Sequence, residues 1–158
     1  MKRQPAITYT LLDEMTASPT EPMPAAKRTH QLNRMWGGLA ALETAPQPTA
    51  DDWRVCSDAV NLMETLVFMG EVQDPDGLIN DCAQALAEAG QRHRSQGAAL
   101  RLTGPGLQSL RGVLEDYATA LAQLSARVMV RCHRLTEKRI AAIVRGQKKA
   151  HDLVVVAL

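Results

Sequence analysis

The chain has 158 residues, of which 46% are hydrophobic, and this excludes an intrinsically disordered protein and allows a single domain with its own core. Only 3% of the residues are aromatic, so Leu, Val, Ala, Ile and Met must build that core, and this composition favours helices. No apolar run reaches the length of a membrane span, and no apolar signal segment follows the N-terminal MKRQP, so we expect a cytoplasmic protein.

The net charge of +1 hides a strong asymmetry along the chain. Residues 51–88 contain nine acids and one base, whereas residues 127–149 contain eight bases and one acid. This asymmetry has three interpretations. The basic segment could bind an external acidic or phosphate-bearing partner, or it could pair with the acidic segment of the same chain or of a second copy. In the third interpretation it faces solvent. The sequence leaves these three interpretations open.

Residues 1–24 hold four prolines and are expected to be flexible or extended. Within them Ile7, Tyr9 and Leu11 alternate with threonines, a pattern typical of a short strand. The β-branched tail at 151–158 is a second candidate strand, and the two ends are predicted either to pair as a small ribbon or to fray. A helical domain is expected between them, over residues 25–150.

The first helix is predicted over residues 25–43, with Gly37 and Gly38 in its middle. Glycine is costly inside a helix, so this pair implies a kink or the close approach of another helix. The second helix is predicted to begin at the N-cap Thr49 and to end near Gly70. Its two apolar stripes predict a central helix that is contacted on two sides.

The third helix is predicted to start with Asp74 as N-cap and Pro75 as its first residue, and to end between Gly90 and Ser95.

The last predicted element runs from Thr103 to Gln147. Its apolar residues are spaced alternately three and four apart, which predicts a long helix that packs against another helix. We expect this seam to form a homodimer, although packing within the chain would use the same residues. Whether this helix is continuous, or Thr136 caps a separate short helix, stays open. The apolar seam consists of Leu107, Leu110, Leu114, Tyr117, Leu121, Leu124 and Val128. The predicted fold is thus an all-α bundle of four to five helices with a long C-terminal helix.

Basic residues recur at helical spacing in the second half of this element, and helical geometry places most of them on one face. Like charges four residues apart destabilise a helix, and an acidic or phosphate-bearing partner would relieve this repulsion. We therefore expect the row to bind such a partner. It lacks interleaved aromatic residues, and no first helix of a helix-turn-helix precedes it. The predicted partner-binding residues are Arg127, Arg131, Arg134, Lys138, Arg139, Arg145, Lys148 and Lys149.

No residue pattern in the chain demands a particular chemistry. The three cysteines are widely spaced and form no CxxC pair, so we expect reduced, buried thiols. Cys132 and His133 are adjacent and would point apart on a helix, so they do not form a metal-binding pair. Since neither a nucleophile with a base nor a phosphate-binding loop is recognisable, we expect a protein without catalytic activity, metal or cofactor.

Three stretches of the chain resemble uncharacterised small helical proteins encoded by phages and mobile elements of proteobacteria. They are PMPAAKRTHQLNRMWGGLAALE, PTADDWRVCSDAVNLMETLV and RCHRLTEKRI, and the resemblance covers most of residues 22–156. It implies an accessory protein, a class that often regulates or inhibits host systems, with inhibitors of CRISPR complexes as one example.

Together these features lead us to expect a non-catalytic protein that binds and blocks a protein or nucleoprotein partner. The alternative is a DNA-binding transcriptional regulator that uses the basic segment at 127–149.

Overall fold

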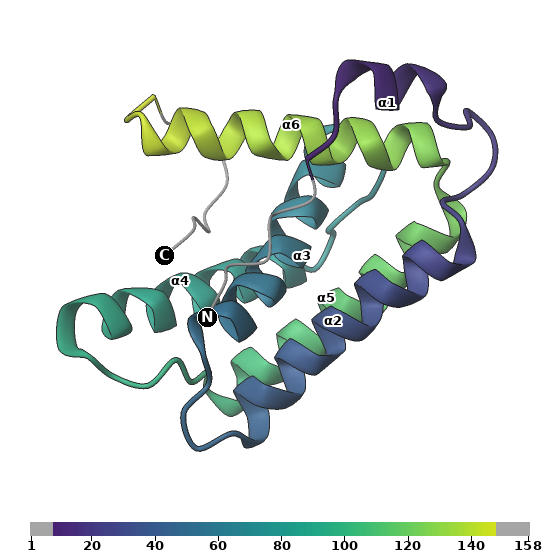
Figure 1. Cartoon of the computed structure of the whole chain (residues 1–158). Helices are drawn as coiled ribbons and strands as arrows, with labels where there is room; N and C mark the ends of the chain where they lie inside the picture. Colours follow the sequence, from purple (N-terminus) through teal and green to yellow (C-terminus); the bar gives the residue numbers. More distant parts are fainter. Residues whose placement is uncertain (1–7, 148–158) are drawn as a thin grey trace.

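A computed structural model of the chain describes residues 8–147, and over this range it contains helices but no strand (Figure 1). The all-α prediction is confirmed at this level. Five helices have 19 or 20 residues and one has six. The helices are α1 (Leu11–Thr16), α2 (Ala25–Thr44), α3 (Ala50–Phe68), α4 (Leu78–Gln96), α5 (Gly104–Gln123) and α6 (Ala126–Val144).

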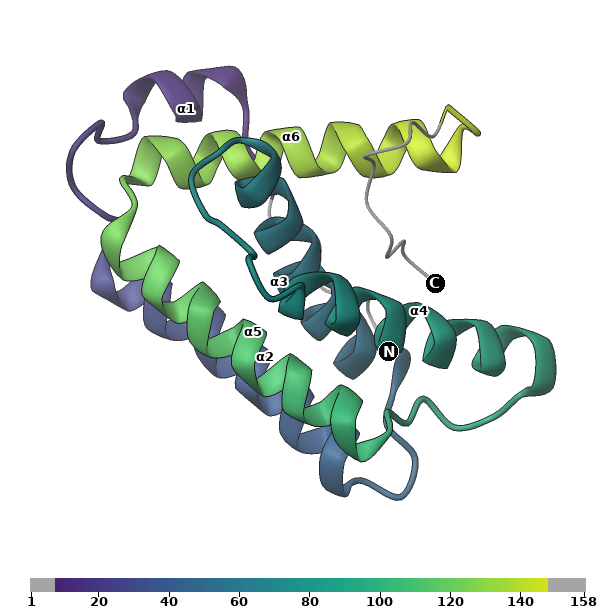
Figure 2. The ribbon, with the colours of Figure 1, turned by 180° about the vertical axis from the view of Figure 1, so that it is seen from behind.

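Helix α3 is the centre of the fold and packs against α2, α4, α5 and α6. Helices α2 and α5 lie side by side along one flank, and α6 crosses the C-terminal end of α3 (Figures 1 and 2). Trp53 of α3 is buried, and its indole N–H donates a hydrogen bond of 3.0 Å to the carbonyl of Leu86 in α4. The predicted central position of this helix is confirmed.

The start of α3 follows directly from its sequence. The Thr49 hydroxyl accepts a hydrogen bond from the Asp52 N–H, while the Asp52 carboxylate accepts one from the Thr49 N–H. This reciprocal capping box satisfies two donors that a helix start otherwise leaves unpaired. The Thr103 hydroxyl caps α5 by accepting a hydrogen bond from the Gly106 N–H. The predicted N-cap Thr49 and the predicted start of the last element at Thr103 are thus confirmed.

The glycine pair of α2 marks a close approach of two helices. A Cβ atom built on Gly38 would lie 2.9 Å from the backbone oxygen of Asp52 and 3.2 Å from the Cys56 sulfur. A Cβ on Gly37 would meet nothing within 4 Å. Only Gly38 is therefore needed for α2 to pack against α3.

The predicted long C-terminal helix is divided into α5 and α6. Helix α5 ends at Gln123, and Ser125 then starts α6 by accepting a hydrogen bond from the Val128 N–H. The apolar spacing continues across this break, which is why the sequence suggests one element. Thr136 lies inside α6 and caps nothing, so a separate helix starting there was a wrong alternative.

The apolar seam of α5 is used within the chain. Leu110, Leu114, Tyr117 and Leu121 have no exposed surface in the folded monomer. The seam therefore packs the bundle, and these four residues present no surface to a second copy.

Helix α4 begins later than predicted, at Leu78, with Gly77 as its N-cap in the left-handed region at φ 70°. Asp74 and Pro75 instead belong to the preceding turn, which the Gly77 N–H closes on the Asp74 carbonyl. The Asp74 carboxylate still accepts a hydrogen bond of 3.2 Å from the Ile79 N–H. The aspartate thus caps the first turn from a more distant position.

The N-terminal segment is not wholly flexible or extended, because it contains α1. Thr10 and Asp13 form a second reciprocal capping box that starts this helix. The predicted strand over residues 7–11 is wrong for its described part, since Thr10 is a helix N-cap and Leu11 is helical. The candidate strand at 151–158 lies outside the described residues.

Candidate partner-binding surface

The inner face of α6 packs on α3 and contains one of the predicted binding residues. Arg139 is only 8% exposed, and its guanidinium lies 4.5 Å above the ring of Phe68. It also donates toward the hydroxyl of Thr65 at 3.5 Å. Arg139 therefore belongs to the α3–α6 interface, and the prediction that it widens an external basic patch is wrong.

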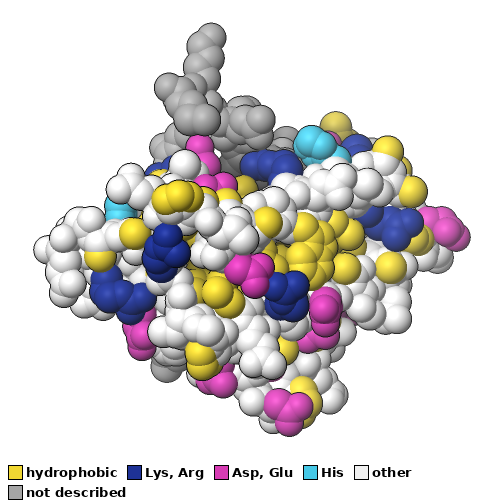
Figure 3. Space-filling view, turned by 90° about the horizontal axis from the view of Figure 1, so that it is seen from below, with side chains coloured by type: hydrophobic (Ala, Val, Ile, Leu, Met, Phe, Trp, Pro, Cys, Tyr) yellow, Lys and Arg dark blue, Asp and Glu magenta, His cyan; other side chains and the backbone are white. Residues whose placement is uncertain are grey.

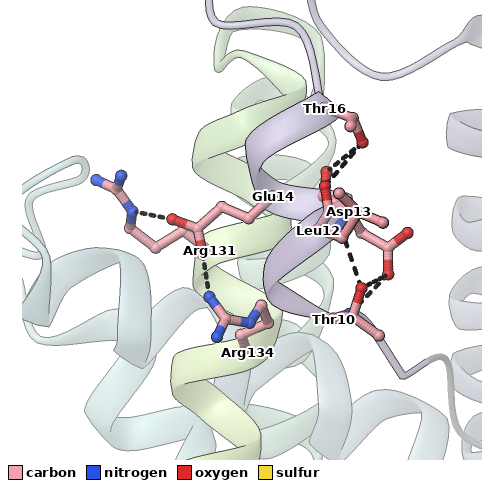
Figure 4. Close-up of polar contacts among 7 residues, drawn as sticks. All are labelled: Thr10, Leu12, Asp13, Glu14, Thr16, Arg131 and Arg134. Atoms are coloured by element: carbon pink, nitrogen blue, oxygen red, sulfur yellow. Dashed lines mark hydrogen bonds and ion pairs between the residues drawn. The ribbon is translucent and has the colours of Figure 1, made fainter.

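The outer face of α6 carries two arginines that converge on one carboxylate, Glu14 of α1 (Figure 4). The Arg131 Nε lies 2.8 Å from Oε1 of Glu14, and the Arg134 Nη1 binds Oε2. Glu14 is 8% exposed. The hydrogen bond from Arg131 lowers the pKa of this carboxyl against the opposing effect of burial, and Arg134 lowers it further.

Arg127 binds the end of α1 through backbone oxygens. Its guanidinium donates to the carbonyl of Met15 at 3.1 Å and to that of Ala17 at 3.3 Å. A cation suits these carbonyls because they form the negative end of the helix dipole. In addition, the N–H groups of Ala126 and Arg127 donate to the carbonyls of Glu21 and Ser18. Residues 8–24, which we call the N-terminal strap, thus lie across the first half of α6.

Part of the basic segment is therefore matched inside the chain. The partner of Arg131 and Arg134 is Glu14, an acid of the N-terminal strap and not of the 51–88 segment. Sequence analysis missed Glu14 because the strap was expected to be flexible or extended. The capping-box spacing of Thr10 and Asp13 is the signal that predicts a helix there.

Helix α1 is oriented with its acid inward and its large apolar side chains outward. Leu11, Leu12 and Met15 are 56%, 68% and 65% exposed, whereas Glu14 is buried. An amphipathic helix usually buries its apolar face. The side chain of Arg131 also remains 57% exposed beside this helix. Together Leu11, Leu12, Met15 and Arg131 form a mixed apolar and cationic surface, which we call the α1 face.

A second feature of α6 is an open hollow of about 570 Å³ between its C-terminal half and the start of α1. Lys138 and Arg145 line it and form no ion pair with the described part of the chain. Arg134 also lines it, and Glu137 adds one negative charge. Other lining residues include Tyr9, Thr10, Leu11, Ala141, Ala142 and Gln147.

Two of the predicted binding residues, Lys148 and Lys149, lie outside the described residues. Of the other six, the structure brings Arg127, Arg131 and Arg134 into contact with the strap and places Lys138 and Arg145 at the hollow. On the side shown in Figure 3, charges of both signs are interspersed around apolar side chains. No field of a single sign is visible on that side.

His133 of α6 lies beneath the strap. Its ring is 5.2 Å from the ring of Tyr9, and its Nε2 is buried without a hydrogen-bond partner in the described structure. Burial lowers the pKa of this imidazole to about 4. The ring is therefore neutral at physiological pH.

The cysteines Cys56, Cys82 and Cys132 are free and buried, as the sequence predicts. Within residues 8–147, no three of the side chains that commonly bind metals are grouped together. In that range, too, no helix has the length and hydropathy needed to cross a membrane.

Comparisons with protein-family models, with curated proteins and with solved structures yield no significant match for this chain.

Proposed function

We propose that this protein is a non-catalytic binding protein that docks on a protein or nucleoprotein partner and blocks it. The single observation that carries the proposal is the inverted orientation of α1. A short helix that exposes Leu11, Leu12 and Met15 gains little from its own fold, because those side chains stay in water. Burial of these side chains against a partner would supply the hydrophobic stabilisation that α1 lacks in the free protein.

The composition of the α1 face supports a protein as the partner. Methionine and arginine are enriched at protein interfaces, and exposed apolar side chains rimmed by charge are typical of docking sites. Arg131 stands beside the apolar stripe, and its side chain is 57% exposed. A partner with an apolar groove and acidic residues at its rim would complement this surface.

The resemblance to accessory proteins of phages and mobile elements suggests where to search for the partner. An inhibitor of a host CRISPR complex is the most specific version of the proposal. Such a complex combines protein and nucleic acid, so it offers both apolar grooves and phosphates.

The test is a plasmid-interference assay in proteobacterial hosts with active CRISPR systems of several types. Expression of the wild-type protein is expected to restore transformation by a targeted plasmid in at least one host. The double variant Leu12→Gln and Met15→Gln keeps helix-forming side chains but removes the apolar stripe, and it should lose at least tenfold of this effect. Failure of the wild type in every host would reject the defence-inhibitor version.

The matched control is Val144→Gln. Val144 is an apolar residue of α6 that is 73% exposed and lies outside the α1 face. Its substitution should leave the activity unchanged. Equal loss in the control and in the double variant would show that general surface hydrophobicity, and not the α1 face, is responsible.

A further inference from the structure

Helix α6 and its C-cap Arg145 carry five cations in one row. Arg127, Arg131, Arg134, Lys138 and Arg145 fall within about 60° of one another around the helix at 3.6 residues per turn. With a rise of 1.5 Å per residue, the row is about 27 Å long. A single carboxylate neutralises only a short part of such a row, whereas a linear polyanion matches its whole length.

The two parts of the row are in different states. The guanidiniums of Arg131 and Arg134 are bound to Glu14, and that of Arg127 is bound to carbonyls of the strap. Lys138 and Arg145 face the open hollow and have no anionic partner among residues 8–147. The strap thus binds the cations of one part of the row and leaves those of the other without a bound carboxylate or carbonyl from residues 8–24.

We propose that the row binds the phosphate backbone of duplex nucleic acid, and that Glu14 occupies its covered part as an internal competitor. Phosphates enter first at Lys138 and Arg145 and then replace the Glu14 carboxylate at Arg134 and Arg131. This inference rests on the proposed function, since it assigns the nucleic-acid component of a nucleoprotein partner. Duplex is favoured over single strands because the row offers no interleaved aromatic residues for base stacking.

The strap is suited to displacement. Helix α1 has six residues, makes its main helix–helix contact with α6, and is bound there by the polar contacts of Glu14 and Arg127. Isolated helices of this length are not stable in water. Tyr9 and Ala17, which flank α1, are only partly buried against the core, whereas Met23 at the end of the strap belongs to it. Displacement is therefore proposed for α1 and not for the end of the strap.

The test compares Glu14→Gln with Glu21→Gln. Glu21 belongs to the same strap, and its side chain is exposed and makes no hydrogen bond or ion pair in the described structure. Both variants therefore raise the net charge equally, but only the first frees the arginines. Binding of a fluorescein-labelled 24-base-pair duplex is measured by fluorescence anisotropy between 50 and 300 mM salt.

Glu14→Gln is expected to bind the duplex at least tenfold more tightly than the wild type at 50 mM salt. The slope of log affinity against log salt should stay close to that of the wild type, because the duplex contacts the same phosphates in both proteins once it has displaced Glu14. Glu21→Gln should match the wild type, and Lys138→Ala with Arg145→Ala should weaken binding. Equal gains in both glutamate variants, or no binding by any variant, would overturn the proposal.

Two further measurements keep the test decisive. Hydrogen exchange of the amides of α1 should accelerate when duplex binds the wild type, and unchanged exchange would mean that Glu14 is not displaced. Inorganic phosphate at equal ionic strength should compete no better than chloride; stronger competition would assign the row to small phosphates instead. All these readouts use purified components, so they can fail independently of the plasmid-interference assay.

Discussion

The hydroxyl of Thr136 in α6 donates a hydrogen bond of 2.7 Å to the hydroxyl of Thr65 in α3, and both residues are buried. The Thr65 hydroxyl in turn donates to the carbonyl of Asn61, one turn earlier. Next to it, the Cys132 thiol donates to the carbonyl of Leu62. This chain of polar contacts fixes where α6 crosses α3, and so it positions the face that carries the cation row.

The threonine pair provides the first prediction. Thr136→Val should lower the free energy of unfolding by about 0.5–1.5 kcal/mol, because one neutral hydrogen bond is lost. Thr65→Val should cost more, about 1–3 kcal/mol, since it leaves the buried Thr136 hydroxyl without its acceptor. Urea denaturation followed by circular dichroism measures both effects.

The double variant is the control for this pair. When both partners are replaced by apolar groups of the same shape, no hydroxyl of the pair remains to be satisfied. Its loss should be smaller than the sum of the two single losses. An additive result would mean that the two hydroxyls do not interact.

The second prediction concerns the two adjacent glycines of α2. Gly37→Ala should stabilise the protein by about 0.5–1 kcal/mol, because alanine is the better helix former and its Cβ has room. Gly38→Ala gains the same propensity but places its Cβ 2.9 Å from the Asp52 backbone oxygen, which cannot move without shifting the start of α3. We expect a net loss of about 1–3 kcal/mol for this variant.

Thermal melting of the two single variants side by side is the measurement. Because both substitutions lie in the same helix, Gly38→Ala serves as the reference for Gly37→Ala. Stabilisation of both would contradict the close contact between α2 and α3.

These positions also show how far the sequence predicts the structure. Helix boundaries with strong caps, such as Thr49 and Thr103, follow from local side-chain chemistry and were predicted. The break before Ser125 was not predicted, because the apolar spacing is the same on both sides of it and neither Gly nor Pro marks it. Direction changes of this kind depend on packing against α3, which a linear pattern does not contain.

The candidate site was predicted only in part, for a related reason. Charge spacing identified the row on α6, yet the same spacing included Arg139, whose neighbours on α3 bury it. The partner of the row, Glu14, lies more than 110 positions away in the chain. Pairing at such a separation follows from the fold and not from local sequence.

The third prediction concerns the thiols. Burial raises the pKa of Cys82 and of Cys132 to about 12 and that of Cys56 higher still. Since the thiolate is the reactive form, all three should be inert toward Ellman's reagent in the native protein at pH 8 and react only as fast as the chain unfolds. Rapid labelling of one thiol in native conditions would contradict this arrangement.

The fourth prediction follows from His133. Its pKa is about 4 in the folded protein, against an ordinary value of 6.5, so the unfolded chain takes up a proton first as the pH falls. Stability contributed by the neutral ring is therefore fully present above pH 6.5 and is lost progressively between pH 6.5 and 4. Urea denaturation at pH 5, 6 and 7 should show the free energy of unfolding falling toward acid pH.

His133→Phe isolates this contribution, because it removes the titrating group while keeping a ring against Tyr9. The variant should lose less stability than the wild type between pH 7 and pH 5, and other titrating groups affect both proteins equally. If His133→Phe and the wild type fall in parallel, the imidazole under the strap is not buried in its neutral form, and the strap does not cover α6 in the way described.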